Sequence, residues 1–596
     1  MTFKTYFLFL SAICFSLYAQ AQATEQWSSK VDPSLLVEVE EGNTVDFLIV
    51  LKEQRSLNSS PTKKTKEEKG RYVFEQLQKV AKESQQSLRS FLESKNITYQ
   101  SFFIINSIYT KGKLTLIKEL ASRNDVAQIQ NNPEIKMEEP ELVLTDVTNG
   151  ASQRTDAEWG LKMIGADKVW DMGIRGEGVV VAGQDTGYEW EHITLKEKYR
   201  GWDGTDADHN YNWHDAIHVI SLLHGDTIVM ESLNSCGLNS LVPCDDHNHG
   251  THTMGTMLGS DADHSIGVAP NAKWIACRNM ERGYGSPVSY IECYEWMLAP
   301  TDLNNANPDP YKSPHVINNS WSCPEMEGCN EGNWATMNTV VDNLKAAGIV
   351  VVVSAGNSGS QGCESINAPS AMFDNSFTIG ASMEADTIAH FSSRGPVTVD
   401  GSGRMKPNVI APGFQVLSSI RNNGFARFNG TSMSGPHVAG AVALIISANK
   451  DLAGQVEAIE NILESTAVAK TNGETCGGLS ADAVPNHIAG YGRIDVLAAV
   501  EKALAMKAAV QDNEDGVAVL VRPNPARDLI QFELQNFKGA TTIDIFDAAG
   551  RLLITEELQA DVFEVHSMSL ARLMAGVYFY QVRNEERFVE GKIVRF

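Results

Sequence analysis

The chain has 596 residues, of which 43% are hydrophobic and 21% charged, a composition typical of folded domains and not of disordered chains. At roughly 150 residues per domain, this length predicts about three or four domains. The formal net charge of −25 argues against nucleic acid or an anionic membrane as a partner, because binding to phosphates needs clustered Lys and Arg.

The first residues have the pattern of a secretory signal peptide. Lys4 supplies a positive charge, residues 6–18 are mostly apolar, and residues 19–21 and 21–23 (both AQA) are small-residue cleavage sites. We therefore assign residues 1–23 to a signal peptide. No later stretch is long and apolar enough to span a bilayer, so the sequence predicts no transmembrane segment.

Eight cysteines remain once Cys14, which lies in the signal peptide, is set aside. An even number of cysteines in an exported protein favours disulfide bonds. Short loops favour the pairs Cys236–Cys244 and Cys277–Cys293. The remaining four allow three pairings, which the sequence leaves open: Cys323, Cys329, Cys363 and Cys476.

Residues 24–150 predict a small α/β domain. The run VDFLIVL at 45–51 is typical of a strand, and apolar residues at helical spacing predict a helix over 67–95. A second strand region at 99–110 precedes a helix and a strand within 113–130. The expected order is therefore βαββαβ, followed by a polar stretch that leads into the next domain.

Residues 151–508 predict a larger α/β domain. Short β-branched runs such as GVVVAG (178–183) and GIVVVVSAG (348–356) alternate with helical segments. Strands that are apolar on both faces indicate a parallel sheet covered by helices on both sides.

Residues 516–596 predict a small all-β sandwich, because strand-like runs alternate with turns and Ala549–Gly550 suits a hairpin turn.

Two acid–base candidates lie in the α/β domain. Asp185 directly follows an apolar strand, where α/β sheets gather functional groups, although an isolated acid there is more often a turn or cap residue. His249 lies in HNHGTHTMG, before small residues at helical spacing. His247, His249 and His252 alternatively suggest a zinc cluster, but their spacing is not that of HExxH.

Asn357 and Ser432 are the other two candidates. Asn357 ends a buried strand next to a glycine, so its amide either donates to a developing oxyanion or belongs to an ordinary turn. Ser432 lies in NGTSMSGPHVAG at the start of an apolar helix, where it is either a helix cap or a nucleophile. A serine nucleophile needs a histidine base, an orienting carboxylate and oxyanion donors.

These four motifs, taken in chain order, resemble the signatures of the subtilisin-like serine proteases, the subtilases. The matching stretches are DTG at 185–187, HGTH at 249–252, AGN at 355–357 and GTSMSGPHVAG at 430–440. The order Asp, His, Ser also separates this family from chymotrypsin-like and α/β-hydrolase enzymes. Supporting segments are GVAPNAKW, VINNSWS, FSSRGP and KPNVIAPG, and the resemblance extends from about residue 158 to residue 500.

The resemblance implies a secreted serine endopeptidase that needs no cofactor for its chemistry. Ser432 would be the nucleophile, His249 the general base and Asp185 the residue that orients the imidazole. Asn357 and the backbone N–H of Ser432 would form the oxyanion hole. The alternative from another class is a catalytically inactive protein of this fold that binds peptides at the cell surface.

The resemblance also implies edges that pair with the backbone of protein or peptide substrates. The residues concerned are Ser320, Trp321, Ser322, Ser354, Ala355 and Gly356. Trp321 stands where many relatives carry a smaller apolar residue. Many subtilases bind calcium, and Asp203, Asp206 and Asp208 offer oxygen ligands at suitable spacing, the alternative being an exposed acidic loop.

The two flanking domains resemble known accessory domains. Residues 24–150 resemble the inhibitory propeptide of subtilases, which would make the chain an autoinhibited zymogen, the alternative being a permanent accessory domain. Residues 516–596 resemble sorting domains of the type IX secretion system, through RPNPARD, IFDAAGRLL, LMAGVYFYQV and GKIVRF, the alternative being a generic adhesive or stabilising sandwich. We therefore expect an outer-membrane secretion machinery as a partner and a location outside a Gram-negative cell, reached through the periplasm.

Overall fold

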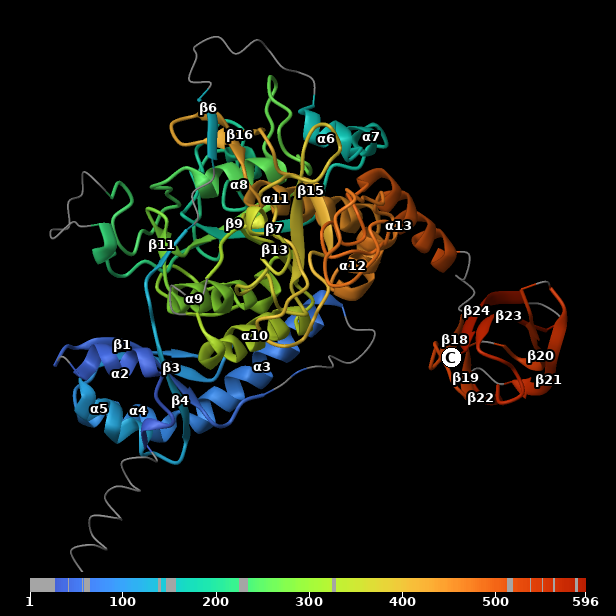
Figure 1. The fold of residues 1–596 in the computed structure, drawn as a ribbon, viewed down its shortest axis with the longest axis horizontal. Coiled ribbons are helices and arrows are strands. Elements are labelled where there is room, and N and C mark those ends of the chain that lie inside the picture. The colour runs from blue at the N-terminus through green and yellow to red at the C-terminus, as the bar shows by residue number, and fades with distance from the viewer. Residues whose placement is uncertain are drawn as a thin grey trace, which may run out of the picture. The chain divides into compact units, whose positions relative to one another are not determined.

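The computed structural model divides the chain into two compact units, Met1–Ala503 and Leu504–Phe596. The structure describes residues 27–40, 42–55, 57, 65–137, 141–145, 157–224, 234–323, 329–511, 518–535, 537–548, 550–560, 563–584 and 588–595. The predicted signal peptide lies outside these described residues. Figure 1 draws the helices and strands of both units.

The N-terminal part of the first unit, residues 27–137, is an α/β fold with a four-stranded antiparallel sheet in the order β2-β3-β1-β4. Its elements follow the predicted βαββαβ order after one additional helix. They are α2 (Pro33–Glu40), β1 (Val45–Leu51), α3 (Lys66–Ser84), α4 (Gln86–Ser94), β2 (Tyr99–Phe102), β3 (Ser107–Gly112), α5 (Leu114–Ala121) and β4 (Val126–Asn131).

The centre of the first unit is a seven-stranded parallel sheet in the order β15-β14-β13-β12-β7-β9-β8. The predicted α/β class is therefore confirmed. Its strands are β7 (Val180–Asp185), β8 (Trp213–Asp215), β9 (Lys273–Arg278), β12 (Val316–Asn319), β13 (Val350–Ser354), β14 (Phe377–Ser382) and β15 (Val409–Pro412).

Helices cover both faces of this sheet. The pair α8 and α11 packs on one face and the pair α9 and α10 on the other (Figure 1). The helices are α6 (Trp159–Met163), α7 (Ala166–Asp171), α8 (His249–Leu258), α9 (Pro287–Leu298), α10 (Glu331–Ala346), α11 (Thr431–Ala448), α12 (Val456–Ser465) and α13 (Val496–Gln511). Short 3₁₀ turns are η1 (Lys196–Lys198), η2 (Leu222–His224), η3 (Pro310–Lys312), η5 (Gly359–Gln361) and η6 (Lys450–Leu452).

Two small antiparallel sheets flank the parallel one. One has the order β10-β11-β5 and the other β16-β17-β6. Their strands are β5 (Ile135–Lys136), β6 (Glu141–Thr145), β10 (Met280–Glu281), β11 (Tyr284–Gly285), β16 (Val416–Ile420) and β17 (Gly424–Asn429). Each small sheet therefore joins a strand from residues 135–145 to a strand of the larger α/β fold.

The N-terminal part shares a hydrophobic core with the larger fold. Val73 and Leu77 on α3 belong to the same buried cluster as Met297 on α9 and Val340 on α10. Burial of such side chains stabilises a fold by about 1.5–3 kcal/mol each. The face of the larger fold that carries α9 and α10 is therefore covered by the N-terminal part.

Among the residues that the structure describes, four disulfides lie in the first unit. The two predicted pairs are present, Cys236–Cys244 and Cys277–Cys293. The three-way choice that the sequence left open is resolved as Cys323–Cys329 and Cys363–Cys476.

One helix among the described residues, α11, is long and apolar enough to cross a membrane by length and composition. This stretch is 94% buried inside the protein, as is usual for a core helix of a globular fold.

The second unit contains two antiparallel sheets, β18-β19-β22 and β21-β20-β23-β24. Apolar side chains of both sheets, including Phe532 and Ile543, form one core, as expected for a sandwich. The predicted hairpin turn falls between β20 and β21, although Ala549 itself is outside the described residues. The strands are β18 (Ala518–Arg522), β19 (Leu529–Gln535), β20 (Gly539–Phe546), β21 (Leu552–Ala560), β22 (Phe563–Ser569), β23 (Gly576–Arg583) and β24 (Phe588–Arg595).

Candidate active site

The fold carries the four candidate residues on separate elements of the parallel sheet and its helices. Asp185 is the last residue of β7 and His249 the first residue of α8. Ser432 is the second residue of α11, and Asn357 follows the end of β13. Carboxyl ends of parallel strands open onto one edge of a sheet, so residues distant in sequence can meet there.

Asp185 and His249 are in direct contact. The Nδ1 atom of His249 lies 2.7 Å from Oδ1 of Asp185, and both side chains are almost fully buried. The same carboxylate oxygen accepts a hydrogen bond from the backbone N–H of Thr186 at 2.7 Å. Because Nδ1 donates to the carboxylate, Nε2 is the ring nitrogen that can accept a proton.

Ser432 lies at the start of α11 and is 7% exposed. Its Oγ donates to the backbone oxygen of Ser320 at 3.3 Å. The Nε2 atom of His249 has no hydrogen-bond partner among the described residues, so the serine and histidine are not hydrogen-bonded to each other in this structure. Such bonds are often long in enzymes without substrate and tighten when substrate binds.

Asn357 is held beside Ser432 by Thr431, the residue that precedes Ser432 in α11. Its Oδ1 accepts hydrogen bonds from the backbone N–H and the hydroxyl of Thr431, at 2.8 and 3.0 Å. Since the carbonyl end of the amide is held by Thr431, the Nδ2 end is the one free to donate to another acceptor. This arrangement suits a donor to negative charge that develops next to Ser432.

One residue that the sequence reasoning missed, Asp245, connects the Asp185 loop to the His249 helix. Its Oδ1 accepts from the hydroxyl of Thr186 at 2.9 Å and from the backbone N–H of His247 and Asn248. Its Oδ2 accepts from the backbone N–H and hydroxyl of Thr251, at 3.1 and 2.6 Å. An acid at this position also suits the helix N-terminus electrostatically. The pair of acids just before HNHGTH was the available signal in the sequence.

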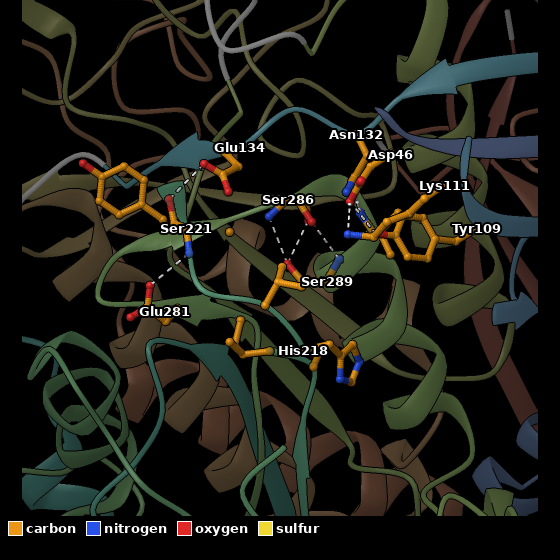
Figure 2. A pocket seen from close by; sticks show the side chains of 16 residues that line it. Asp46, Tyr109, Lys111, Asn132, Glu134, His218, Ser221, Glu281, Ser286 and Ser289 are labelled. Carbon is orange, nitrogen blue, oxygen red and sulfur yellow. Dashed lines mark hydrogen bonds and ion pairs between the residues drawn. The ribbon is translucent and has the colours of Figure 1, made fainter. Parts of the chain in front are cut away.

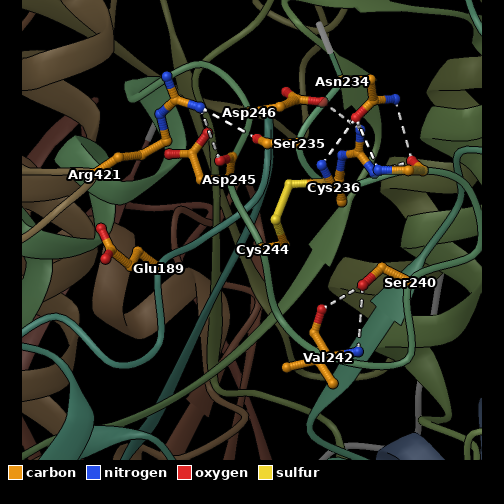
Figure 3. The surroundings of a disulfide bond; sticks show 12 residues. Glu189, Asn234, Ser235, Cys236, Ser240, Val242, Cys244, Asp245, Asp246 and Arg421 are labelled. Carbon is orange, nitrogen blue, oxygen red and sulfur yellow. Dashed lines mark hydrogen bonds and ion pairs between the residues drawn. A yellow bond between two sulfur atoms is a disulfide. The ribbon is translucent and has the colours of Figure 1, made fainter. Parts of the chain in front are cut away.

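Figure 3 shows that Asp245 directly follows the Cys236–Cys244 disulfide. The adjacent Asp246 forms a buried ion pair with Arg278, and Arg421 donates to the backbone oxygen of Asp245 at 3.3 Å. The loop before α8 is therefore held by a covalent bond, an ion pair and the hydrogen bonds of Asp245.

The zinc alternative receives no support from the histidine contacts. The Nε2 atom of His252 lies 3.1 Å from two backbone oxygens, those of Val416 and Ala426, to which it donates. Among the described residues there is no group of three or more His, Cys, Asp or Glu side chains that could hold a metal ion.

Two of the three predicted calcium ligands, Asp203 and Asp208, accept hydrogen bonds within their own loop. Oδ1 of Asp203 accepts from the backbone N–H of Thr205 and Asp206, and Oδ1 of Asp208 accepts from the backbone N–H of Asn210. Neither these carboxylates nor any others in the described ranges form a metal-binding group. The residues present therefore do not fit a preformed calcium site, and calcium binding stays a prediction.

The predicted substrate edges border a small cavity of about 20 Å³ next to Ser432. Its walls include five of the predicted substrate-binding residues: Ser320, Trp321, Ser322, Ser354 and Gly356. Ala355 is not part of the wall but is buried, with its backbone N–H donating to Ile379. Trp321 stacks on Tyr290 with ring centroids 3.8 Å apart, which fixes this bulky side chain in place.

A chain segment at the end of the predicted inhibitory propeptide lies along the site. Met137 lines the same cavity as Ser432, and its backbone N–H donates to the backbone oxygen of Gly283 at 2.7 Å. Just before it, β5 pairs with β11. Just after it in sequence, β6 pairs with β17, where Glu141 lies opposite Asn429. In the sequence, Gly283 and Gly285 on either side of Tyr284 are the feature that could have indicated a strand edge at β11.

Comparison with known families gives two matches. Residues 176–492 match the model described as the subtilase family. Residues 520–595 match the model described as a secretion system C-terminal sorting domain.

Among curated relatives, Bacillopeptidase F of Bacillus subtilis is 31% identical over 486 residues, which cover 77% of this chain. The match covers only 32% of Bacillopeptidase F, so the chain spans about a third of that relative's length. Subtilisin DY of Bacillus licheniformis is 32% identical over 311 residues, covering 52% of this chain and 90% of the relative. Subtilisin E of Bacillus subtilis is 34% identical over 223 residues, covering 36% of this chain and 51% of the relative.

Proposed function

Because the chain belongs to the subtilase family, we propose that it is a serine endopeptidase that hydrolyses peptide bonds in proteins through Ser432, His249 and Asp185. The observation that carries the proposal is the buried 2.7 Å contact between His249 and Asp185. A neutral imidazole held in this way presents Nε2 as a base, which a serine hydroxyl needs to become a nucleophile.

The reaction proceeds by acyl transfer in two halves. In the first, Oγ of Ser432 attacks the substrate carbonyl carbon while Nε2 of His249 takes the hydroxyl proton. The same proton passes to the leaving amine, the peptide C–N bond breaks and an acyl-enzyme remains. In the second half, water attacks the ester carbonyl while His249 takes a proton from that water. The ester bond then breaks, the carboxylic acid product leaves and His249 passes the water's proton to Oγ of Ser432.

Charge that develops during both halves is stabilised by fixed groups. Asp185 stabilises the imidazolium form of His249 across the 2.7 Å contact. The Nδ2 atom of Asn357 and the backbone N–H of Ser432 donate to the oxyanion. The backbone edges at Ser320–Ser322 and at β11 pair with the substrate chain as added β-strands do.

The chain is made as a zymogen whose N-terminal part occupies the substrate edges. Support comes from the pairing of β5 with β11 and of β6 with β17, and from Met137 in the cavity beside Ser432. The backbone N–H groups of Phe103 and Ile104 also donate to the carboxylate of Glu295 on α9. While the pairing of β5 with β11 lasts, a substrate chain cannot pair with that edge.

A cavity of about 170 Å³ lies where the N-terminal part meets the larger fold beside β11, and Figure 2 shows the side chains that line it. Across this boundary, the hydroxyl of Ser221 donates to Glu134 at 2.9 Å and the backbone N–H of Val288 donates to Asn132 at 3.0 Å. Two hydrogen bonds therefore cross the boundary beside a space that side chains leave unfilled.

The sorting domain indicates a secreted or cell-surface protein of a Gram-negative bacterium. We assign its recognition to an outer-membrane secretion machinery, which would receive the protein from the periplasm.

The test of the proposed chemistry is Ser432→Ala in the full chain, which should reduce casein hydrolysis at least about 10³-fold because only the attacking oxygen is lost. Ser447→Ala, on the same helix but away from the site, is the matched control. A fluorophosphonate probe should label the parent chain and the control but not Ser432→Ala. Hydrolysis that survives Ser432→Ala and stops with a chelator would instead support the zinc alternative, and no labelling of the processed parent would support an inactive peptide-binding protein.

A further inference from the structure

The N-terminal part contacts the larger fold at a second place, where α3 begins. We propose that Ser313 and Gly454 form an anchor for two lysine ammonium groups, Lys66 and Lys69, which keeps the N-terminal part bound after the connecting chain is cut. This inference rests on the proposed zymogen function. The N-terminal part is thus held at two places, the substrate edges and the anchor. Cleavage of the chain near Ser432 does not remove the anchor.

Lys66 is the deeper of the two groups, with 3% of its surface exposed. Its Nζ donates to the backbone oxygen of Ser313 at 2.8 Å and to the hydroxyl of Ser313 at 2.7 Å. That hydroxyl in turn donates to the backbone oxygen of Pro310, which fixes it as an acceptor for the lysine. Both of these acceptors of the buried ammonium are uncharged, so its placement depends on two well-positioned oxygens.

Lys69 enters the larger fold one helical turn later and is 9% exposed. Its Nζ donates to the backbone oxygen of Gly454 at 2.7 Å, and Oε1 of Gln455 lies 3.5 Å away. Residues three apart lie on the same face of a helix, so both ammonium groups point into the larger fold together.

The helix start is held in register by its own cap. Thr65 and Glu68 form a capping box, in which each side chain accepts a hydrogen bond from the backbone N–H of the other residue. The cap fixes where the first turn of α3 begins, and with it the positions of both lysine side chains.

Two glycines allow the close approach of this turn. Gly454 has a φ of +77°, and a Cβ atom there would lie 2.8 Å from Cα of Lys66. Gly348, with a φ of +82°, would place a Cβ atom 2.8 Å from Cα of Gly454. A side chain at either position would therefore push the helix start away from the larger fold.

The chemistry of the anchor selects lysine. Burying an ammonium group is costly unless hydrogen-bond acceptors replace its water. Methionine would fill the space without donating, and the bulkier planar guanidinium of arginine does not match oxygens placed for a compact ammonium. The surface that accepts α3 is therefore built for this chain's own N-terminal part.

The anchor and the substrate edges involve different elements. Ser313 follows η3 and Gly454 follows η6, whereas the inhibitory pairing uses β11 and β17. When two contacts are linked, release of one leaves the other at a high effective concentration for rebinding. Cutting the chain next to Ser432 therefore leaves the inhibitor attached at Lys66 and Lys69.

Hydrogen exchange on the full-length Ser432→Ala chain tests the anchor without any catalysis. Adding Lys66→Met or Lys69→Met should speed exchange of the first turn of α3 about ten-fold, because hydrogen bonds to charged groups are lost. Lys79→Met, an exposed lysine on the same helix, is the matched control and should change nothing. Unchanged exchange in both anchor variants would overturn the proposal.

A variant on the other side of the contact guards against misfolding of the N-terminal part. Gly454→Asn keeps a residue type that tolerates positive φ but adds a Cβ atom against Lys66. It should speed the same amides, and exchange equal to that of the parent chain would overturn the close approach.

The second measurement is size-exclusion chromatography of chains that keep Ser432 and can therefore process themselves. After processing, a smaller share of the cut N-terminal part should elute with the larger fold in the Lys66→Met, Lys69→Met double variant than in the parent and in Lys79→Met, because the shared hydrophobic core remains. An equal share in the double variant would contradict the anchor. If the parent chain yields no cut fragment, the zymogen proposal fails, while the exchange comparison still decides the anchor.

Discussion

Asp245 illustrates at the residue scale how a side chain outside the proposed triad can control it. It accepts five hydrogen bonds that join Thr186, next to Asp185, to the first turn of the helix that carries His249. We expect Asp245→Ala to lower kcat about 10²-fold, the cost of displacing a reacting group by about 1 Å. KM for a peptide substrate should stay nearly constant, because Asp245 is not among the residues that line the cavity beside Ser432.

Two further variants make this prediction specific. Asp263→Ala removes an exposed acid that follows the same helix and should leave both constants unchanged. Asp245→Asn keeps one acceptor oxygen and should recover part of kcat. A rise in KM with constant kcat would show that Asp245 acts on substrate binding and not on the position of His249.

His218 provides a pH-dependent contribution to stability. Its Nε2 lies 3.0 Å from the buried carboxylate of Glu292, and this hydrogen bond raises the pKa of His218 to about 9. A raised pKa in the folded state means that the stabilisation is complete below the ordinary value of 6.5 and is lost as the pH rises through about 9. Because the His218 side chain is 39% exposed, solvent screening reduces the expected contribution to about 1 kcal/mol.

Urea unfolding of the Ser432→Ala chain between pH 6 and 9.5 measures this contribution. The free energy of unfolding should fall about 1 kcal/mol less over this range when His218→Gln is added. His390→Gln, which changes an exposed histidine, is the control, and its free energy of unfolding should fall by as much as that of the parent. Parallel curves for the parent and His218→Gln would rule out a role for this pair.

The sequence identified the chemistry-bearing residues but not what holds them. Asp185, His249, Asn357 and Ser432 lie in short glycine-containing motifs, whose residue types are set by local backbone and chemical needs. The contact between Asp185 and His249 spans 64 positions and follows from the parallel sheet, which the apolar runs predicted. Met137 carried no such signal, because a single methionine in a polar stretch has no local pattern that indicates its neighbours.

At the scale of elements, the local sequence pattern predicted where helices and strands lie but not where they are interrupted. The expected strand at 45–51 is β1 without change. The expected helix over 67–95 is divided at Gln85, whose side chain donates to the backbone oxygen of Phe102 at 2.8 Å. The expected strand region at 99–110 is divided where Phe103 and Ile104 donate to Glu295. Both divisions depend on partners distant in sequence, so no local pattern could show them.

The pairing of β5 and β6 with the edges of the larger fold leads to a prediction on maturation. We expect cleavage between Pro140 and Asp156, because this stretch joins two packed parts of the chain. Terminal sequencing of the purified mature protein should then give a first residue within 141–156. The Ser432→Ala chain, produced without other proteases, should keep its N-terminal part, whereas Ser447→Ala should lose it. Normal processing of Ser432→Ala would assign the cut to another enzyme.

At the scale of the whole molecule, the sequence pattern predicted three regions after the signal peptide: an N-terminal α/β part, a larger α/β fold and a C-terminal sandwich. The structure joins the first two in one compact unit. The N-terminal part and the larger fold form one compact unit, because apolar residues of α3 pack into the same cluster as α9 and α10. From sequence, Val73 and Leu77 indicated only that α3 has an apolar face. Which surface that face covers is a tertiary property, so the sequence did not show the shared core.

The C-terminal unit gives the last prediction, since its core is formed by its own strands and it contains none of the four candidate catalytic residues. We expect a chain that ends after Gln511, the last residue of α13, to fold and cleave substrate when expressed alone. In its native host the same truncation should accumulate in the periplasm, because the predicted signal peptide provides passage across the inner membrane only. Cell fractionation with activity measurements on each fraction checks both halves, with the full chain as the control. Normal arrival of the truncated chain at the surface or in the medium would refute the sorting role, and insolubility in every host would make the sandwich a structural part of the enzyme.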